Sequence, residues 1–250
     1  MGKRLAFLCG TGEFKSEYIT NLDSVKNDVN DLEEILLDED LGYFDDVSKF
    51  IGENKNGLDD KLNLFLSEAS EDDLVVFYYT GHGLLDKDGR LYFSLPNSEI
   101  DDPYPESMSS FRVRELIKNC SANKKVVILD CCHSGGFDKG QAMGTSDIIA
   151  VDQSTFEEQS DHYFVLASSS KTQKSFTEGS RAVFTRALID GLKTGEAGGS
   201  NSKIMLIELA DYIRKKISNS EFPMTPYVSC LLYTSPSPRD QRGSRMPSSA

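Results

Sequence analysis

Short runs of apolar residues alternate along the chain with longer segments in which apolar residues recur at helical spacing. The runs are typical of strands that are buried on both faces, because such strands lose the alternation of polar and apolar side chains. The spaced segments are typical of amphipathic helices. The pattern predicts strands at 4–9, 46–51, 74–79, 90–95, 125–130 and 163–167, and helices at 22–38, 58–66, 111–119, 183–192 and 204–217.

This order of strands and helices predicts one α/β domain with a doubly wound, mostly parallel six-stranded sheet and helices on both faces. The segment 90–95 is expected to be a small hairpin strand outside that parallel set. The last strand of the sheet is expected around 225–229, next to an abrupt change in composition, so the closure of this sheet edge stays open.

The domain is predicted to span residues 1–230. Within it, the polar segment 137–161 has little periodicity and is predicted to be a mobile loop after the second motif described below. Residues 231–250 are rich in Pro, Ser and Arg, and we assign them to a non-native or disordered tail outside the domain.

Composition narrows the classes of partner and compartment. The 250-residue chain has a net charge of −13, which argues against nucleic acid and anionic membranes and favours cationic peptides. Its apolar runs are all shorter than the roughly 20 residues of a membrane-spanning helix. The five cysteines form no CxxC motif and no disulfide framework, so a reducing, cytoplasmic location is expected.

Two short motifs follow two of the predicted buried strands. One is Tyr-Tyr-Thr-Gly-His-Gly, which contains His82, and the other is Asp-Cys-Cys-His-Ser-Gly-Gly, which contains Cys132. Because the carboxyl ends of parallel strands meet at one edge of a sheet, His82 and Cys132 are expected to lie together. An imidazole that takes the proton of a thiol makes a nucleophile at neutral pH, and the backbone N–H groups of Gly83 and Cys132 could hold an oxyanion.

Less specific interpretations exist for each motif alone, since a single Cys or His is more often a packing residue than a reactive one. A zinc site could combine His82, Cys131, Cys132 and His133. Three adjacent ligands do not easily close a tetrahedron around one ion, so no metal site is expected here.

The two motifs resemble those of the caspase family of clan CD cysteine peptidases, in its metacaspase-like or prokaryotic caspase-like branch. Thr80 to Gly83 is similar to the family's Ser-Gly-His-Gly segment, and Asp130 to Gly135 to its Asp-x-Cys-His-Ser-Gly segment. Weaker similarity extends over most of residues 4–229. The resemblance implies that Cys132 is the nucleophile and His82 the base. Strand alternation likewise directs Cys131 away from the side of Cys132, as a packing residue.

The resemblance also implies a first substrate pocket that reads Arg or Lys. Asp28 and Asp130 would form its acidic floor, and Thr80 would supply a hydroxyl. Animal caspases have Gln at the position of Asp130 and arginines that bind an acidic side chain. The alternatives are a solvated helix acid for Asp28 and a capping or structural acid for Asp130.

Two features of the resemblance are weaker. The acid-rich insertion that many metacaspases use for calcium is not obvious, and Asp86, Asp88, Asp101 and Asp102 fit turn acids, so no cofactor is expected and calcium is not supported by the sequence. Lys139 is a candidate self-cleavage point, with an ordinary exposed loop lysine as its alternative.

Together these features predict a cysteine endopeptidase that cuts peptides or proteins after Arg or Lys through an acyl-enzyme. By family resemblance, its role would be regulatory proteolysis in stress, cell death or defence. The alternatives are a catalytically silent caspase-like interaction domain and another clan CD cysteine hydrolase of the legumain or gingipain kind. The physiological substrate, the activating signal and the oligomeric state are left open by the sequence.

Overall fold

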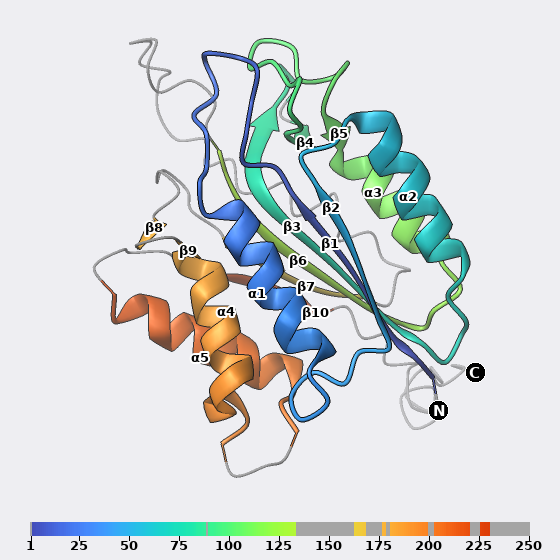
Figure 1. Cartoon of the computed structure of the whole chain (residues 1–250), viewed down its shortest axis with the longest axis vertical. Coiled ribbons are helices and arrows are strands. Elements are labelled where there is room, and N and C mark those ends of the chain that lie inside the picture. The colour runs from blue at the N-terminus through green and yellow to red at the C-terminus, as the bar shows by residue number, and fades with distance from the viewer. Residues whose placement is uncertain are drawn as a thin grey trace, which may run out of the picture.

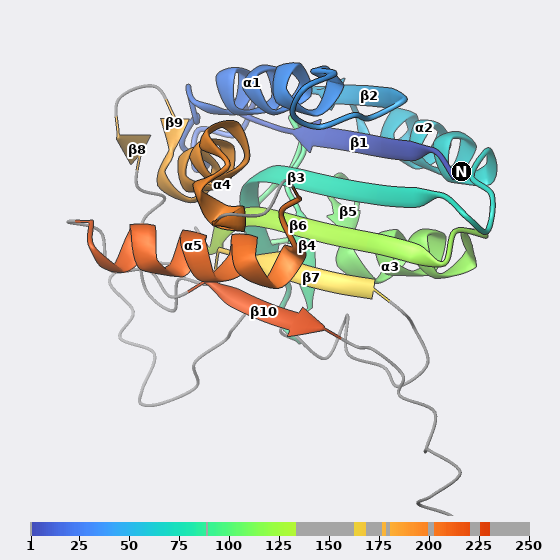
Figure 2. The same cartoon turned by 90° about the horizontal axis from the view of Figure 1, so that it is seen from below.

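A mostly parallel sheet runs through the centre of the molecule, with helices on both faces (Figures 1 and 2). The computed structural model describes residues 2–88, 90–133, 163–168, 177–178, 181–199, 203–220 and 226–230. The main path of the sheet has the order β10-β7-β6-β3-β1-β2, and only β10 runs antiparallel to its neighbour. These strands are β1 (Arg4–Gly10), β2 (Asp46–Ile51), β3 (Leu74–Leu85), β6 (Lys124–His133), β7 (Tyr163–Ala167) and β10 (Tyr227–Cys230).

Smaller elements extend this framework. Strand β3 also pairs with β4 (Leu91–Phe93), which pairs with β5 (Met108–Ser109), and β8 (Thr177–Glu178) pairs separately with β9 (Arg181–Ala182). The helices are α1 (Val25–Leu37), α2 (Lys55–Ser67), α3 (Ser110–Asn119), α4 (Val183–Thr194) and α5 (Leu206–Ser218), with a short 3₁₀ turn at Glu196–Gly198.

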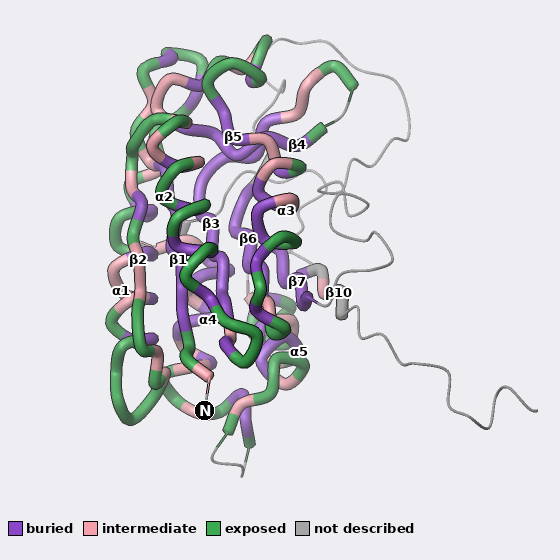
Figure 3. The backbone as a smooth tube through the Cα atoms, turned by 90° about the vertical axis from the view of Figure 1, so that its right-hand side faces the viewer, coloured by how far each residue is buried: buried purple, intermediate pink, exposed green. Residues whose placement is uncertain are grey.

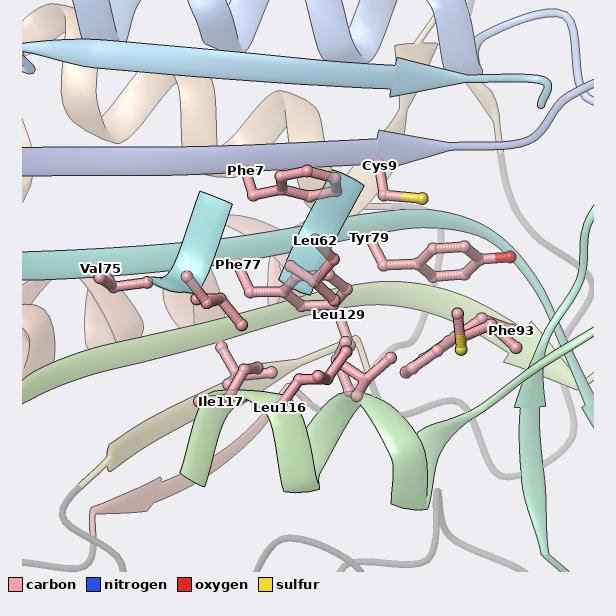
Figure 4. Packing of buried hydrophobic residues seen from close by; sticks show 14 of the residues in the cluster. Phe7, Cys9, Leu62, Val75, Phe77, Tyr79, Phe93, Leu116, Ile117 and Leu129 are labelled. Carbon is pink, nitrogen blue, oxygen red and sulfur yellow. The ribbon is translucent and has the colours of Figure 1, made fainter. Parts of the chain in front are cut away.

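The two faces of the sheet have separate hydrophobic cores. On one face, α2 and α3 cover a cluster that includes Phe7, Phe77 and Leu129 (Figure 4). On the other face, α1, α4 and α5 cover a cluster that includes Leu8 and Phe184. The central strands are buried along their length between these layers (Figure 3), which explains why they are continuous apolar runs in the sequence.

The predicted α/β class and the six-stranded main path are confirmed, including a final strand at Tyr227–Cys230. The predicted ends of two strands were wrong. Strand β3 continues past Tyr79 to Leu85 and β6 continues to His133, because the two strands pair in parallel through Gly83 and His133. His82 and Cys132 therefore lie within paired strand extensions rather than in loops beyond them.

Gly81 makes the extension of β3 feasible. It has a φ of +154°, and a Cβ atom there would lie 2.5 Å from the Tyr79 hydroxyl oxygen and 3.1 Å from the Thr11 carbonyl oxygen. The Tyr79 hydroxyl occupies this space because it donates to the carbonyl groups of His82 and Ser94, both at 3.0 Å. A side chain at position 81 would thus push on the Thr11 carbonyl and on the Tyr79 hydroxyl, which is bonded to the His82 carbonyl.

The predicted mobile loop at 137–161 and the predicted tail at 231–250 lie outside the described residues. Across the part of the chain that is described, no helix is both long enough and apolar enough to cross a membrane.

Candidate active site

The register of the two central strands brings the two sequence motifs together. His82 of β3 is the direct partner of Cys132 of β6, one step after Gly81 pairs with Cys131. Paired residues of neighbouring strands are about 5 Å apart at Cα, which is within reach of an imidazole and a thiol on the same side of a sheet. The Cys132 backbone is part of β6, whereas its side chain lies outside what the structure describes.

The ring of His82 is held at only one of its two nitrogens. Nε2 lies 2.8 Å from the carbonyl oxygen of Thr20, and the Phe14 ring packs beside the imidazole with 5.4 Å between ring centroids. A carbonyl oxygen only accepts hydrogen bonds, so Nε2 carries the proton and Nδ1 keeps its lone pair. Among the described residues, the buried Nδ1 has no hydrogen-bond partner.

Burial keeps this histidine neutral. The side chain is 5% exposed, and the loss of hydration lowers the pKa of His82 below its usual 6.5, an effect that the bond to Thr20 only partly offsets. Near neutral pH, the imidazole is therefore in the form that accepts a proton.

A loop between β1 and α1 supplies the Thr20 carbonyl, and three contacts fix that loop. The Ser16 hydroxyl donates to Glu99 at 2.9 Å, and the Lys15 N–H donates to the Pro96 carbonyl at 2.9 Å. Ile19 is buried in a small hydrophobic cluster with Leu84 and Tyr92. The orientation of His82 thus depends on a segment far from it in sequence.

Asp130 is buried on the face of the sheet that α1 and α4 cover, and it is thoroughly hydrogen-bonded. Its Oδ1 accepts from the Ser168 hydroxyl at 2.9 Å. Its Oδ2 accepts from the Thr185 hydroxyl at 2.5 Å and from the Thr185 N–H at 3.2 Å. A carboxylate has about four acceptor sites, so three of them are used by the protein.

Asp28 lies in the same buried region and has weaker partners. It is 0% exposed, so the alternative of a solvated helix acid is wrong. Both of its oxygens lie 3.3 Å from the Ala182 nitrogen, which donates to them. Burial first, and the negative charge of Asp130 second, raise the pKa of Asp28 to about 7. Burial also raises the pKa of Asp130, against the opposing effect of its three donors.

Both carboxylates bind the start of helix α4. Ala182 is the N-cap residue and Thr185 lies in the first turn, where N–H groups have no partner within the helix. The N-cap side chain makes no capping bond, so Asp28 and Asp130 fill that role from outside the helix. Asp130 therefore caps helix α4, which is one of the alternatives given for it above. This capping contact is compatible with a contact to substrate.

Next to the acid pair, Arg181 forms an ion pair with Asp31 at 2.5 Å between Nε and Oδ2. This pair attaches β9 to α1 one turn after Asp28. Arg181 therefore already has a carboxylate partner of its own beside Asp28.

The other predicted site residues take varied positions. Thr80 is buried and is paired with Asp130 in the β3–β6 register, and Gly83 is paired with Phe93 of β4 and His133 of β6. Cys131 is buried in the cluster under α2 and α3, on the opposite face from Asp130, as strand alternation predicts. Lys139 lies outside the described residues.

The acidic turn around Asp86 makes local hydrogen bonds. Asp86 accepts from the N–H groups of Asp88 and Arg90, both at 2.9 Å. Within the described ranges, no group of three or more His, Cys, Asp or Glu residues is arranged to hold a metal ion. The position of Cys131 in the opposite core further disfavours the zinc set.

Sequence reasoning missed Thr20, Ser168 and Thr185. Each of them acts on His82 or Asp130 across at least 38 positions of the chain. The only signal for Ser168 and Thr185 was the weaker similarity to the caspase family that extends over most of residues 4–229.

Comparison with known proteins bears on the family and the fold. The family model described as "Caspase domain" matches residues 3–246. No curated protein sequence matches the chain. Among solved structures, protein GSU0716 of Geobacter sulfurreducens is 17% identical with a TM-score of 0.65, over 95% of this chain and 96% of that one. Caspase-1 of Spodoptera frugiperda is 16% identical with a TM-score of 0.63, over 93% and 88% of the two chains.

Proposed function

Because the chain belongs to the caspase-domain family of clan CD cysteine peptidases, we propose that it is an endopeptidase that cleaves protein substrates after Arg or Lys. Cys132 is the nucleophile and His82 the general base. The observation that carries this proposal is the combination of the His82–Cys132 register pair with a buried, unpartnered His82 Nδ1.

The reaction follows from the tautomer of His82. Nδ1 accepts the proton of the Cys132 thiol, and the sulfur then attacks the carbonyl carbon of the peptide bond. The N–H groups of Gly83 and Cys132 stabilise the oxyanion of the tetrahedral intermediate. The carbon–nitrogen bond breaks as the proton on Nδ1 passes to the leaving amine, and water hydrolyses the thioester with His82 again as base.

The bond from Nε2 to Thr20 supports both proton transfers. It fixes the ring orientation and stabilises the imidazolium that forms transiently, without any acidic third residue. A backbone carbonyl does this with a modest effect on basicity. His82 therefore remains a weak base that releases its proton easily to the leaving group.

Selectivity for basic residues is supported by the acid pair. Asp28 and Asp130 are both buried; burial raises the pKa of each, and repulsion from the Asp130 charge raises that of Asp28 further. A guanidinium or ammonium group between them would relieve that repulsion. An acidic substrate side chain would increase it, so cleavage after Asp is disfavoured.

A panel of fluorogenic peptides tests the reaction and its selectivity. The peptides end in Arg, Lys, Asp or Asn before the reporter group. We expect turnover after Arg or Lys, and a loss of at least about 10⁴-fold in kcat/KM for Cys132→Ala. The matched control is Cys131→Ala, which changes a neighbouring thiol that packs in the opposite core, and which should keep activity within a few-fold.

Other outcomes identify the alternatives. Turnover after Asp or Asn, with none after Arg or Lys, contradicts the pocket assignment and favours another clan CD hydrolase. Absence of turnover on every peptide favours a silent interaction domain. Full activity in Cys132→Ala contradicts the nucleophile. A parallel series with calcium or a chelator measures metal dependence, and mass spectrometry of the incubated protein measures cleavage after Lys139.

The proposed biological role is regulatory proteolysis in stress, cell death or defence, by analogy within the family. A reducing, cytoplasmic compartment suits a thiol enzyme, and the described residues Cys9, Cys120 and Cys131 are not part of a disulfide.

A further inference from the structure

We propose that Thr185 is a specificity-positioning residue, which holds Asp130 in place so that the acid pair can bind a basic substrate side chain. This inference rests on the proposed selectivity for Arg or Lys. It assigns to the first turn of α4 a part in substrate choice, through a hydroxyl group that does not touch the reacting atoms.

Thr185 contacts Asp130 in a geometry that fixes the carboxylate. Thr185 binds the same carboxylate oxygen twice, through its hydroxyl at 2.5 Å and its backbone N–H at 3.2 Å. Short bonds to an ionised acceptor are about twice as strong as neutral ones. Two donors from one residue fix both the position and the rotation of the Asp130 carboxylate, with Ser168 on its other oxygen.

The hydroxyl groups of Tyr78 and Thr185 form a buried chain of hydrogen bonds that ends at Asp130. The Tyr78 hydroxyl lies 2.7 Å from the Thr185 hydroxyl. Since the Thr185 proton points to the carboxylate, Tyr78 must donate its own proton to Thr185. Tyr78 and Thr185 are both 0% exposed, so the relay from Tyr78 through Thr185 to Asp130 is shielded from water, and no solvent molecule can replace a missing hydroxyl easily.

Asp28 and Asp130 are both hydrogen-bonded to the start of helix α4. Asp28 accepts from Ala182, three residues before Thr185 at the same helix end. A movement of the α4 terminus would thus change the separation of the two carboxylates. The bond from the Thr185 hydroxyl to Asp130 is the shorter of the two that hold this terminus to β6. It therefore controls how well the two carboxylates fit a guanidinium.

The test compares variants at Thr185 on a peptide substrate that ends in Arg. Thr185→Val keeps the shape of the side chain and removes its hydroxyl. We expect KM to rise about 10-fold with kcat within about twofold of wild type, which corresponds to the loss of one charge-assisted bond. Thr185→Ser restores the hydroxyl and should return KM to within about threefold of wild type.

Two further variants separate positioning from a general loss of structure. Tyr78→Phe removes the hydroxyl that donates to Thr185 and keeps the ring, and a KM increase of about threefold is expected. Thr194 lies at the exposed end of the same helix, where its hydroxyl donates to the Asp190 carbonyl. Thr194→Val is the control and should leave KM unchanged. Thermal unfolding of each variant checks that the protein is folded at the assay temperature.

The results that overturn this inference differ from those that overturn the proposed function. Wild-type turnover after Arg with an unchanged KM in Thr185→Val contradicts the role of the hydroxyl. A fall in kcat with no change in KM, or a failure of Thr185→Ser to rescue, also contradicts it, because either indicates a structural role. A wild-type enzyme that does not cleave after Arg or Lys overturns the proposed function and this inference together.

Discussion

His82 and Asp130 are both buried at the same edge of the sheet, yet their surroundings are opposite. His82 has one hydrogen bond and one nitrogen without a partner among the described residues. Asp130 has three donors on its two oxygens. An open lone pair suits a group that must take and return a proton, whereas a filled shell suits a group that must keep its charge in one place. Under the proposed function, this difference separates proton transfer from substrate recognition at one edge of the sheet.

The largest effect should come from removing either group and measuring both activity and stability. His82→Ala is expected to lower kcat by about 10³-fold, the usual scale of general base catalysis, and the free energy of unfolding by about 1 kcal/mol. Asp130→Ala leaves three buried donors without an acceptor, so it should lower the free energy of unfolding by about 3 kcal/mol. Denaturant titrations and peptide kinetics measure the two quantities. Equal losses of stability would remove the distinction between the two sites.

The pH dependence of KM should follow the acid pair rather than His82. Because the pKa of Asp28 in the free protein is about 7, a cationic side chain must displace a proton from Asp28 below that pH. KM for an Arg peptide should rise by up to about tenfold per pH unit between pH 7 and 6. A peptide with citrulline in place of Arg has no charge and serves as the control. A parallel rise for both peptides would show that Asp28 does not bind the cation.

Asp28→Asn should change stability in the direction opposite to Asp130→Ala. The pKa of Asp28 is raised from 3.8 to about 7 on folding, so between those values the folded state binds more protons than the unfolded state. Stability from this group is therefore present below about pH 4 and is lost as the pH rises to 7. Asp28→Asn should raise the free energy of unfolding by about 2–3 kcal/mol more at pH 8 than at pH 5, because about two pH units of that loss lie between pH 5 and 7. A loss at pH 8 would mean that the ionised carboxylate stabilises the fold.

The smallest effect should come from loosening the loop that orients His82. Ser16→Ala removes the bond to Glu99 and leaves the hydrophobic and backbone contacts of the loop in place. We expect kcat to fall about twofold, with KM unchanged. Ser67→Ala also removes one hydroxyl bond, but on the exposed face of α2, and is the control. A change in KM alone would place the loop with the pocket rather than with the base.

The elements of the main sheet were predictable because each central strand is covered on both faces and so is a continuous apolar run. The ends of β3 and β6 were not, because Gly81 and Gly83 are typical of turns in sequence, and only pairing with both neighbours keeps the chain extended there. His82 and Cys132 were predicted to lie together from their motifs, and the register places them opposite each other.

The supporting contacts could not be predicted from the sequence. The Thr20 carbonyl is a backbone group, and its residue type carries no information about its use. Thr185 is an ordinary helix residue until the fold brings α4 against β6. Asp28 has acidic neighbours in an amphipathic helix, and its burial depends on β9, which had no detectable pattern.

The attachment of both acids to α4 bears on the order in which the parts of the site are synthesised. His82 and Cys132 lie on paired strands that end at residue 133. The donors that arrange Asp28 and Asp130 are Ala182 and Thr185, some fifty residues later in translation. The contacts that place Asp28 and Asp130 therefore form only after α4 has been synthesised, later in translation than the strands that carry His82 and Cys132.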